Sequence, residues 1–327
     1  MDLESLYYFK ELIRNLNMTQ TAKRLFLSQQ TLSNHIARLE KWCGIPLFYR
    51  KPRLTLTTAG FSLLQFADKV LNQEQEFKEV LSDIAEEARG TIRFGASFIR
   101  YNIALPAVLP DLTRRYPHVS MDLTDDTSDH LQSQLLEGNL DVILSVRNEN
   151  IPGLSSTLLL ANQIYLLVSD RLLKKYYGAE TEIIKERSRH GAHLKDFAKL
   201  PFLMLTPPNR MGTILTNCFE EAGCAPQVYI RTDHLRMSET ISSKALAATF
   251  STTMPLNKTK KQLASDVNIF PLLYKEKPVY HNLYLAYFKN RYHARYLKYF
   301  IELLENYFKN VETMDPSYVH KPEPGVE

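Results

Sequence analysis

The architecture of this chain follows from one segment, residues 19–40, which reads TQTAKRLFLSQQTLSNHIARLE. Its apolar residues recur at the spacing of two short amphipathic helices separated by a break: Ala22 and Leu25, then Leu32, Ile36 and Leu39. Ser28 stands in the break and can cap the second helix, because its hydroxyl can accept a backbone amide of the first turn. Two helices joined so tightly must cross steeply, which predicts a helix-turn-helix.

The second helix of this motif is expected to expose a polar face. That face carries amides, hydroxyls and one cation: Gln29, Gln30, Thr31, Ser33, Asn34 and Arg38. Such side chains hydrogen-bond base edges and phosphates in the major groove of DNA. The alternative is a small helical hairpin whose polar face is simply solvated.

A basic hairpin is predicted directly after the motif. Residues 47–50 and 54–57 have the pattern of two short strands, and Lys51-Pro52-Arg53 lies between them as a basic turn. A hairpin in this place is a wing that can reach backbone phosphate or the minor groove. We therefore expect base contacts from Gln29, Gln30, Thr31, Ser33 and Asn34, and phosphate or minor-groove contacts from Thr19, Arg50 and Arg53.

Residues 3–60 resemble the winged helix-turn-helix of the LysR-type transcriptional regulators. The matching positions keep their order and spacing: Ala22-x-x-Leu25, Ser28-Gln29-x-x-Leu32-Ser33-x-x-Ile36-x-x-Leu39-Glu40, Gly44-Ile45-Pro46-Leu47-Phe48-x-Arg50 and Leu56-Thr57-x-Ala59-Gly60. The chain departs from the family at Thr21, where alanine is usual, and at Asn34, where arginine is common. Asn34 favours an adenine edge whereas arginine favours guanine, so the operator sequence is expected to differ.

Composition and charge agree with a DNA-binding head on a larger domain. The 327 residues suggest two or three domains, and no run of eighteen apolar residues exists that would span a membrane. Residues 1–60 carry a net charge of +5 and the remainder −1, so the basic excess lies wholly in the motif segment. Three cysteines without metal-type spacing suit a reducing cytoplasm.

A long helix is predicted over residues 58–89, after the head formed by residues 1–60. Its apolar positions repeat every seven residues, which is typical of a coiled-coil-like partner helix. The expected dimerisation residues are Leu63, Ala67, Val70, Phe77, Leu81 and Ile84. The alternative is that this stripe packs on its own domain. The resemblance implies a linker helix that pairs in a homodimer, and commonly a homotetramer.

Residues 90–308 alternate strands and helices, which predicts a parallel α/β sheet. One helix is expected from about Asn102 to Arg115, and Ser128 is expected to cap the next. The fold class is therefore α/β, with an N-terminal winged helix-turn-helix and a long linker helix. The resemblance implies that the α/β part is a two-lobed, periplasmic-binding-protein-like regulatory domain, with lobe I at 90–160 and 270–308 and lobe II at 161–269. Residues 174–195 are charged and suggest a surface insertion, and residues 309–327 suggest a disordered tail.

A small-molecule effector is expected beyond the carboxyl ends of the parallel strands. Hydroxyls and one arginine gather there with apolar walls, which suits an anionic ligand: Ser97, Phe98, Arg100, Tyr101, Thr127, Ser145, Met204 and Thr206. The alternative is that Arg100 is a surface residue and the serines only end strands.

We therefore interpret the chain as a cytoplasmic transcription regulator that binds double-stranded DNA at a dyad operator. RNA polymerase would be a further partner if the protein activates transcription. No catalytic, metal or cofactor motif is recognisable, so neither an enzyme nor a cofactor is predicted. The alternative is a small-molecule-binding module whose helical head binds protein, and steep salt dependence of DNA binding would distinguish the two.

Overall fold

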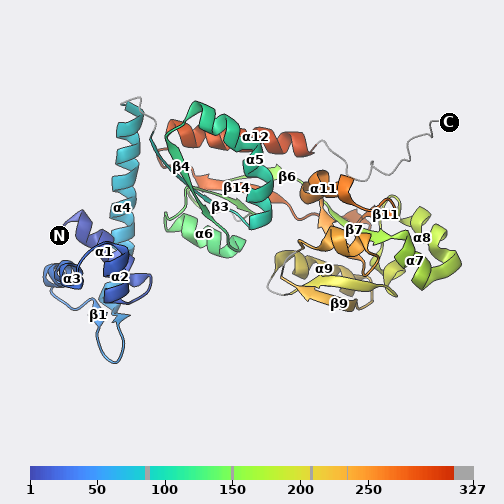
Figure 1. Ribbon diagram of the computed structural model, residues 1–327, viewed down its shortest axis with the longest axis horizontal. Helices are drawn as coiled ribbons and strands as arrows, with labels where there is room; N and C mark the ends of the chain where they lie inside the picture. The colour runs from blue at the N-terminus through green and yellow to red at the C-terminus, as the bar shows by residue number, and fades with distance from the viewer. Residues whose placement is uncertain (85–88, 149–150, 207–208, 234, 313–327) are drawn as a thin grey trace.

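The computed structural model describes residues 1–84, 89–148, 151–206, 209–233 and 235–312. Figure 1 shows a helical head at the N-terminal end, a long helix that leads away from it, and two α/β lobes. The head contains α1 (Leu3–Ile13), α2 (Met18–Arg24), α3 (Gln29–Cys43), β1 (Phe48–Tyr49) and β2 (Thr55–Leu56). The helix-turn-helix and its wing are thus confirmed.

Local signals determine where α3 begins and ends. Ser28 caps its N-terminus, since Ser28 Oγ accepts the amide of Thr31 at 3.0 Å. Gly44 ends the helix in the left-handed conformation (φ 73°) and donates its amide to Glu40. Leu32, Ile36 and Leu39 are fully buried in the core of the head. The opposite side of α3 is therefore left to solvent.

Helix α4 (Thr58–Ile84) carries the six expected dimerisation residues, and the first half of this apolar stripe faces the head of the same subunit. Leu63 and Ala67 are buried in the core of the head, and Val70 packs against that core. Their assignment to a dimer seam is therefore wrong for Leu63 and Ala67, because the first turns of α4 complete the winged domain. Phe77, Leu81 and Ile84 are 61%, 47% and 72% exposed. Residues 85–88 of the predicted linker lie outside the described residues.

Lobe I is built on a five-stranded sheet of order β4-β3-β5-β14-β6. The strands are β3 (Gly90–Gly95), β4 (Val119–Thr124), β5 (Val142–Ser145), β6 (Leu154–Leu160) and β14 (Leu283–Phe288). Strand β3 runs parallel to β4 and β5, but β14 is antiparallel to β5 and β6. The expected parallel sheet is thus mixed, because β14 returns from lobe II in the opposite direction.

Three helices cover the sheet of lobe I: α5 (Phe98–Arg115), α6 (Ser128–Leu136) and α12 (Arg295–Glu312). Helices α5 and α12 pack together on one face, while α6 covers the other (Figure 1). Residues 309–312 belong to α12, so they are helical rather than part of a disordered tail. The remainder of the predicted tail, residues 313–327, lies outside the described residues.

Lobe II contains an antiparallel sheet of order β10-β7-β11 and a parallel pair, β8-β9. The strands are β7 (Ile164–Ser169), β8 (Pro201–Leu205), β9 (Gln227–Thr232), β10 (Thr249–Thr252) and β11 (Val267–Pro271). Two short strands, β12 (Leu273–Tyr274) and β13 (Lys277–Pro278), follow. Strand β11 pairs with β7, and Leu272 is buried in the core of lobe II. The boundary at residue 270, where the chain was expected to re-enter lobe I, was therefore placed too early. Lobe I resumes at β14.

The helices of lobe II are α7 (Asp170–Tyr177), α8 (Thr181–Ser188), α9 (Arg210–Glu221), α10 (Ser238–Ser243) and α11 (Thr253–Thr259). Helices α7 and α8 occupy the charged segment 174–195 that suggested a surface insertion. Ile184 and Leu194 of this segment are buried in the core of lobe II, so it is not a surface insertion. Its apolar residues are few and widely spaced, which explains the wrong prediction.

Candidate nucleic-acid interface and effector cleft

The exposed face of α3 carries the predicted base-reading residues together. Gln29, Gln30, Thr31 and Asn34 are exposed, and Ser33 is half-buried. Gln30 Nε2 donates to Asn34 Oδ1 at 3.0 Å, which orders two amides one helical turn apart. Thr19, in α2, donates its hydroxyl to Gln29 Oε1 at 3.1 Å and so joins the two helices of the motif. No described segment of the chain covers this face.

The two wing arginines lie in different surroundings. Arg50 pairs with Glu40 of α3 at 2.9 Å, and Glu40 also accepts the amide of Leu47. Arg50 therefore fastens the wing to α3, which sequence reasoning missed because it assigned Arg50 to phosphate alone. Arg53 is exposed and makes no ion pair with any described residue. Its guanidinium is available for a phosphate.

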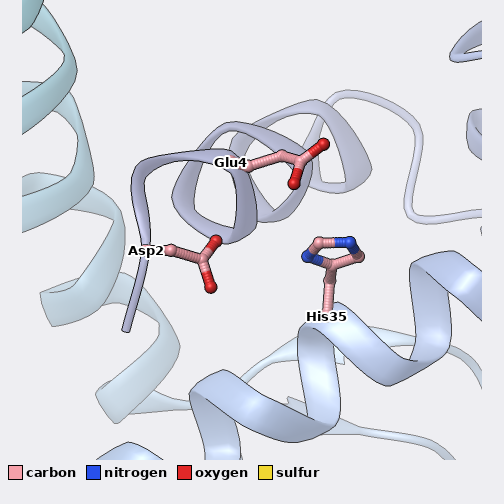
Figure 2. Close-up of side chains that lie close together, drawn as sticks. All are labelled: Asp2, Glu4 and His35. Carbon is pink, nitrogen blue, oxygen red and sulfur yellow. The ribbon is translucent and has the colours of Figure 1, made fainter.

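Asp2, Glu4 and His35 form the one group of possible metal ligands in the described part of the chain, with candidate atoms within 4.8 Å (Figure 2). Ser5 Oγ and the Arg38 guanidinium lie 2.9 and 2.7 Å from His35 Nδ1. Arg38 also lies 3.6 Å from Asp2, so it already supplies a positive charge to this group. The cluster therefore ties α3 to the start of α1.

In lobe I, the start of α5 holds four predicted effector residues. Helix α5 begins at Phe98 rather than near residue 102, so Ser97 becomes its N-cap residue and Phe98, Arg100 and Tyr101 lie in its first turn. The Phe98 amide donates to Asp125 Oδ1 at 2.8 Å. Thr127 caps α6, a role expected of Ser128, and Ser145 is buried at the end of β5.

On the lobe II side, only one of the two predicted residues is available to a ligand. Thr206 is exposed at the end of β8, and its amide donates to the carbonyl of Thr232. Met204 is buried in the core of lobe II, so its assignment as a cleft wall is wrong. Alternate residues of a strand point to opposite faces, and Met204 points inward.

Two arginines and a histidine that sequence reasoning missed, Arg210, Arg236 and His281, lie near Arg100 and Phe98. The Arg236 guanidinium lies over the Phe98 ring, 3.8 Å from its centroid, and so links the two lobes. Burial lowers the pKa of Arg100 to about 10, which leaves it charged at neutral pH. Burial, followed by the charges of Arg100 and Arg210, lowers the pKa of His281 to about 3. No spacing in the sequence indicates this convergence, because the four residues come from distant segments.

Arginines that pair with no described carboxylate are suited to binding an anion. Arg100, Arg210 and Arg236 make no ion pair with a described residue, and within the described chain His281 Nε2 is buried without a hydrogen-bond partner. Arg210 and Arg236 are exposed and Arg100 is half-buried, so their guanidinium groups are accessible to an anionic ligand.

A winged helix-turn-helix that is joined by a long helix to a two-lobed α/β domain defines a class of transcription regulators. Residues 3–61 match the sequence profile of the bacterial regulatory helix-turn-helix protein, lysR family. Residues 85–309 match the LysR substrate binding domain. The chain belongs to the LysR family of transcriptional regulators.

Individual relatives are distant. The chain is similar to the uncharacterized regulator YkuM of Bacillus subtilis (strain 168), with 29% identity over 51% of this chain and 57% of the relative. It is similar to the activator IlvY of Salmonella typhimurium, with 30% identity over 62% of this chain and 66% of the relative. The matches thus span 57% and 66% of the lengths of these two relatives.

Two solved structures share the fold. A full-length OxyR variant from Pseudomonas aeruginosa has a TM-score of 0.68 at 18% identity, covering 98% of this chain and 99% of that one. Full-length CbnR in complex with its target DNA has a TM-score of 0.59 at 20% identity, covering 94% and 99%. Among the described residues, no helix is long and apolar enough to cross a membrane.

Proposed function

We propose that this regulator reads its operator with Gln29, Gln30, Thr31, Ser33 and Asn34, while Thr19, Arg50 and Arg53 hold the DNA backbone. The observation that carries the proposal is the uncovered polar face of α3 beside an unpaired wing arginine. Amides and hydroxyls on such a face match the donors and acceptors of the major groove. Pairing through Phe77, Leu81 and Ile84 would place two heads on dyad-related half-sites, as a homodimer or within a homotetramer.

A small anionic effector between the lobes is the proposed signal. Arg100 and Arg236 can grip a carboxylate or a similar group, and Thr127 and Thr206 offer hydroxyls at the rim. A ligand that contacts both lobes binds the closed arrangement more tightly, so it shifts the population toward closure. Cys43, Cys218 and Cys224 are free thiols, which is consistent with a protein that acts in the reducing cytoplasm.

The test is an operator selection with the full chain. Random duplexes bound by the protein are recovered, sequenced and footprinted. We expect a dyad whose half-sites each contain an adenine that requires Asn34. In Asn34→Arg, the preference at that position should change from adenine to guanine, and each wrong base should cost about 1–3 kcal/mol. Recovery of the same sequences by both proteins, or of no sequence preference, would refute the assignment.

A further inference from the structure

One face of α4 is polar and rests on lobe I. Asn72, Glu76, Glu79 and Asp83 follow one another at three or four residues, so they share a side of the helix. Phe77, Leu81 and Ile84 lie roughly on the opposite side. A partner helix can therefore cover the apolar side while the polar side stays against the subunit's own lobe I.

Hydrogen bonds fix this polar face to the regulatory lobe. Asn72 Nδ2 donates to the carbonyl of Glu137 at 3.0 Å, and Glu76 Oε1 accepts the amide of Tyr292 at 2.7 Å. Asp83 is 5% exposed, and its Oδ2 accepts both the Tyr292 hydroxyl at 2.6 Å and the Arg295 amide at 2.9 Å. Arg295 is the first residue of α12. A carboxylate of α4 thus caps a helix of lobe I across the interface.

Helix α4 and lobe I are in close contact at Gly138. Gly138 has a φ of +78°, and a Cβ at this position would collide with the Asn72 side chain. Lys10 Nζ, in α1 of the head, donates a hydrogen bond to Asn139 Oδ1 of lobe I at 2.9 Å. The same ammonium forms an ion pair with Asp68 Oδ1 of α4 at 2.7 Å. The head, the long helix and lobe I are therefore joined at one place.

Glu79 lies in this interface and lines a small crevice, open to solvent, between α4 and lobe I. The charged and titratable groups around it come from every element packed there: Glu76 and Asp83 on α4, Arg93 on β3, Asp141 before β5, and Arg291, Tyr292, His293 and Tyr296 at the start of α12. Arg93 and Asp141 already pair with each other. The Arg291 guanidinium lies over the Phe288 ring, 4.4 Å from its centroid.

We propose that α4 and lobe I form a latch within one subunit, which is closed when Glu79 is protonated and loosened when Glu79 carries its charge. The latch sets the direction of the winged head relative to the regulatory domain, with Asp83 as the residue that positions α12. It exists in a single subunit and requires neither DNA nor effector, so it stands independently of the proposed function.

The direction of the pH effect follows from linkage. Burial, with the negative charges of Asp141 and Glu76, raises the pKa of Glu79 from 4.5 to about 7, against a hydrogen bond from Gln75 and the charge of Arg93. The closed state therefore binds more protons than the open one. The contribution of Glu79 to closure weakens as the pH rises from 4.5 toward 7 and changes little above that, and between pH 6 and 8 it should fall about tenfold. Burial lowers the pKa of His293 in the same interface, so His293 opposes closure below its usual pKa of 6.5.

Hydrogen exchange of the full chain tests the latch without DNA. Mass spectrometry would follow peptides covering residues 72–84 and 292–299 at pH 6 and pH 8, with rates corrected by the unfolded protein at the same pH. In the wild type, protection of both peptides should fall about tenfold at pH 8. Glu79→Gln should abolish this difference and keep the high protection at both values of pH.

Three variants separate the latch from general loss of structure. Glu74→Gln removes a carboxyl of α4 that pairs with Lys78 instead of lobe I, and it should keep the wild-type difference. Asp83→Ala should remove protection of residues 292–299 at both values of pH, and Asp83→Asn, which keeps an acceptor oxygen, should restore it. Equal wild-type protection at the two values of pH would overturn the proposal. So would a Glu74→Gln that behaves like Glu79→Gln, or an Asp83→Ala without effect.

Discussion

Arg100 shows how a single residue can be unfavourable for the fold and useful for the site. It lies in the first turn of α5, where burial lowers its pKa to about 10 and no described carboxylate pairs with it. Because the group stays protonated at neutral pH, the folded protein holds a poorly solvated charge. An anion bound in the cleft would neutralise that charge and recover the lost free energy.

Replacing Arg100 should therefore have opposite effects on stability and on ligand binding. Arg100→Met should leave the melting temperature without ligand unchanged or raised, since it removes an unpaired buried charge. If the proposed effector site is correct, the same variant should weaken binding of small carboxylates by about 1.5–3 kcal/mol, or roughly 10- to 150-fold. Thermal unfolding across a panel of such ligands measures both effects.

Arg114→Met is the matched control, because Arg114 lies on the same helix but is exposed and pairs with Asp111. It should bind ligands as the wild type does. Equal ligand-induced shifts in Arg100→Met and the wild type would contradict the assignment of Arg100.

Some site residues could be predicted from the sequence and others could not. Gln29 and Asn34 were predicted to be exposed because one helical period fixes which side of α3 faces the core. The cleft depends on how distant segments meet, so Arg210, Arg236 and His281 gave no local signal. Met204 was placed wrongly because the direction of a strand side chain depends on the sheet register, which short apolar runs leave open.

Helix α4 contacts its own subunit on one side and is exposed to solvent on the other. Its N-terminal turns complete the core of the head through Leu63 and Ala67. Its C-terminal half presents Phe77, Leu81 and Ile84 to solvent and a polar face to lobe I. A single heptad pattern predicted one continuous seam, because the pattern cannot show where the subunit's own head covers the helix.

The exposed half of the stripe should control self-association. Phe77→Glu should change the stability of the subunit by at most about 0.5 kcal/mol, because the side chain is exposed. It should weaken the dimer by about 2 kcal/mol or more if Phe77 is buried at the centre of the interface. Sedimentation at several protein concentrations measures this effect.

Ile183→Glu is the control for Phe77→Glu, because Ile183 on α8 is similarly exposed. This variant should associate as the wild type does. Association of Phe77→Glu at wild-type strength would show that the α4 stripe is not the contact between subunits.

Whole elements were predicted best where the signal is local. The cap Ser28 and the wing turn each predicted a boundary that the structure shows. The start of α5 was missed because Phe98, Ile99 and Tyr101 continue the aromatic and β-branched character of the strand before it. Helices α7 and α8 were missed because charged residues hide their few buried positions.

At the scale of the whole molecule, the chain separates a basic head from a nearly neutral regulatory part. The net charge of +5 lies in residues 1–60, which form the head, whereas Arg100, Arg210 and Arg236 lie in the two lobes. The chain crosses between the lobes after β6 and returns before β14. Only the family resemblance predicted this double crossing. The return to lobe I was predicted at residue 270 instead of β14 because β11 and β14 are similar apolar strands.

The most direct test of the account is the salt dependence of binding to the selected operator duplex, followed by fluorescence anisotropy. The logarithm of the association constant should fall linearly and steeply with the logarithm of salt concentration, because bound arginines release counterions from the DNA. Arg53→Ala should reduce that slope by about 1 and leave the sequence preference unchanged. Binding that is insensitive to salt, or an unchanged slope in Arg53→Ala, would contradict a winged head that binds DNA as described.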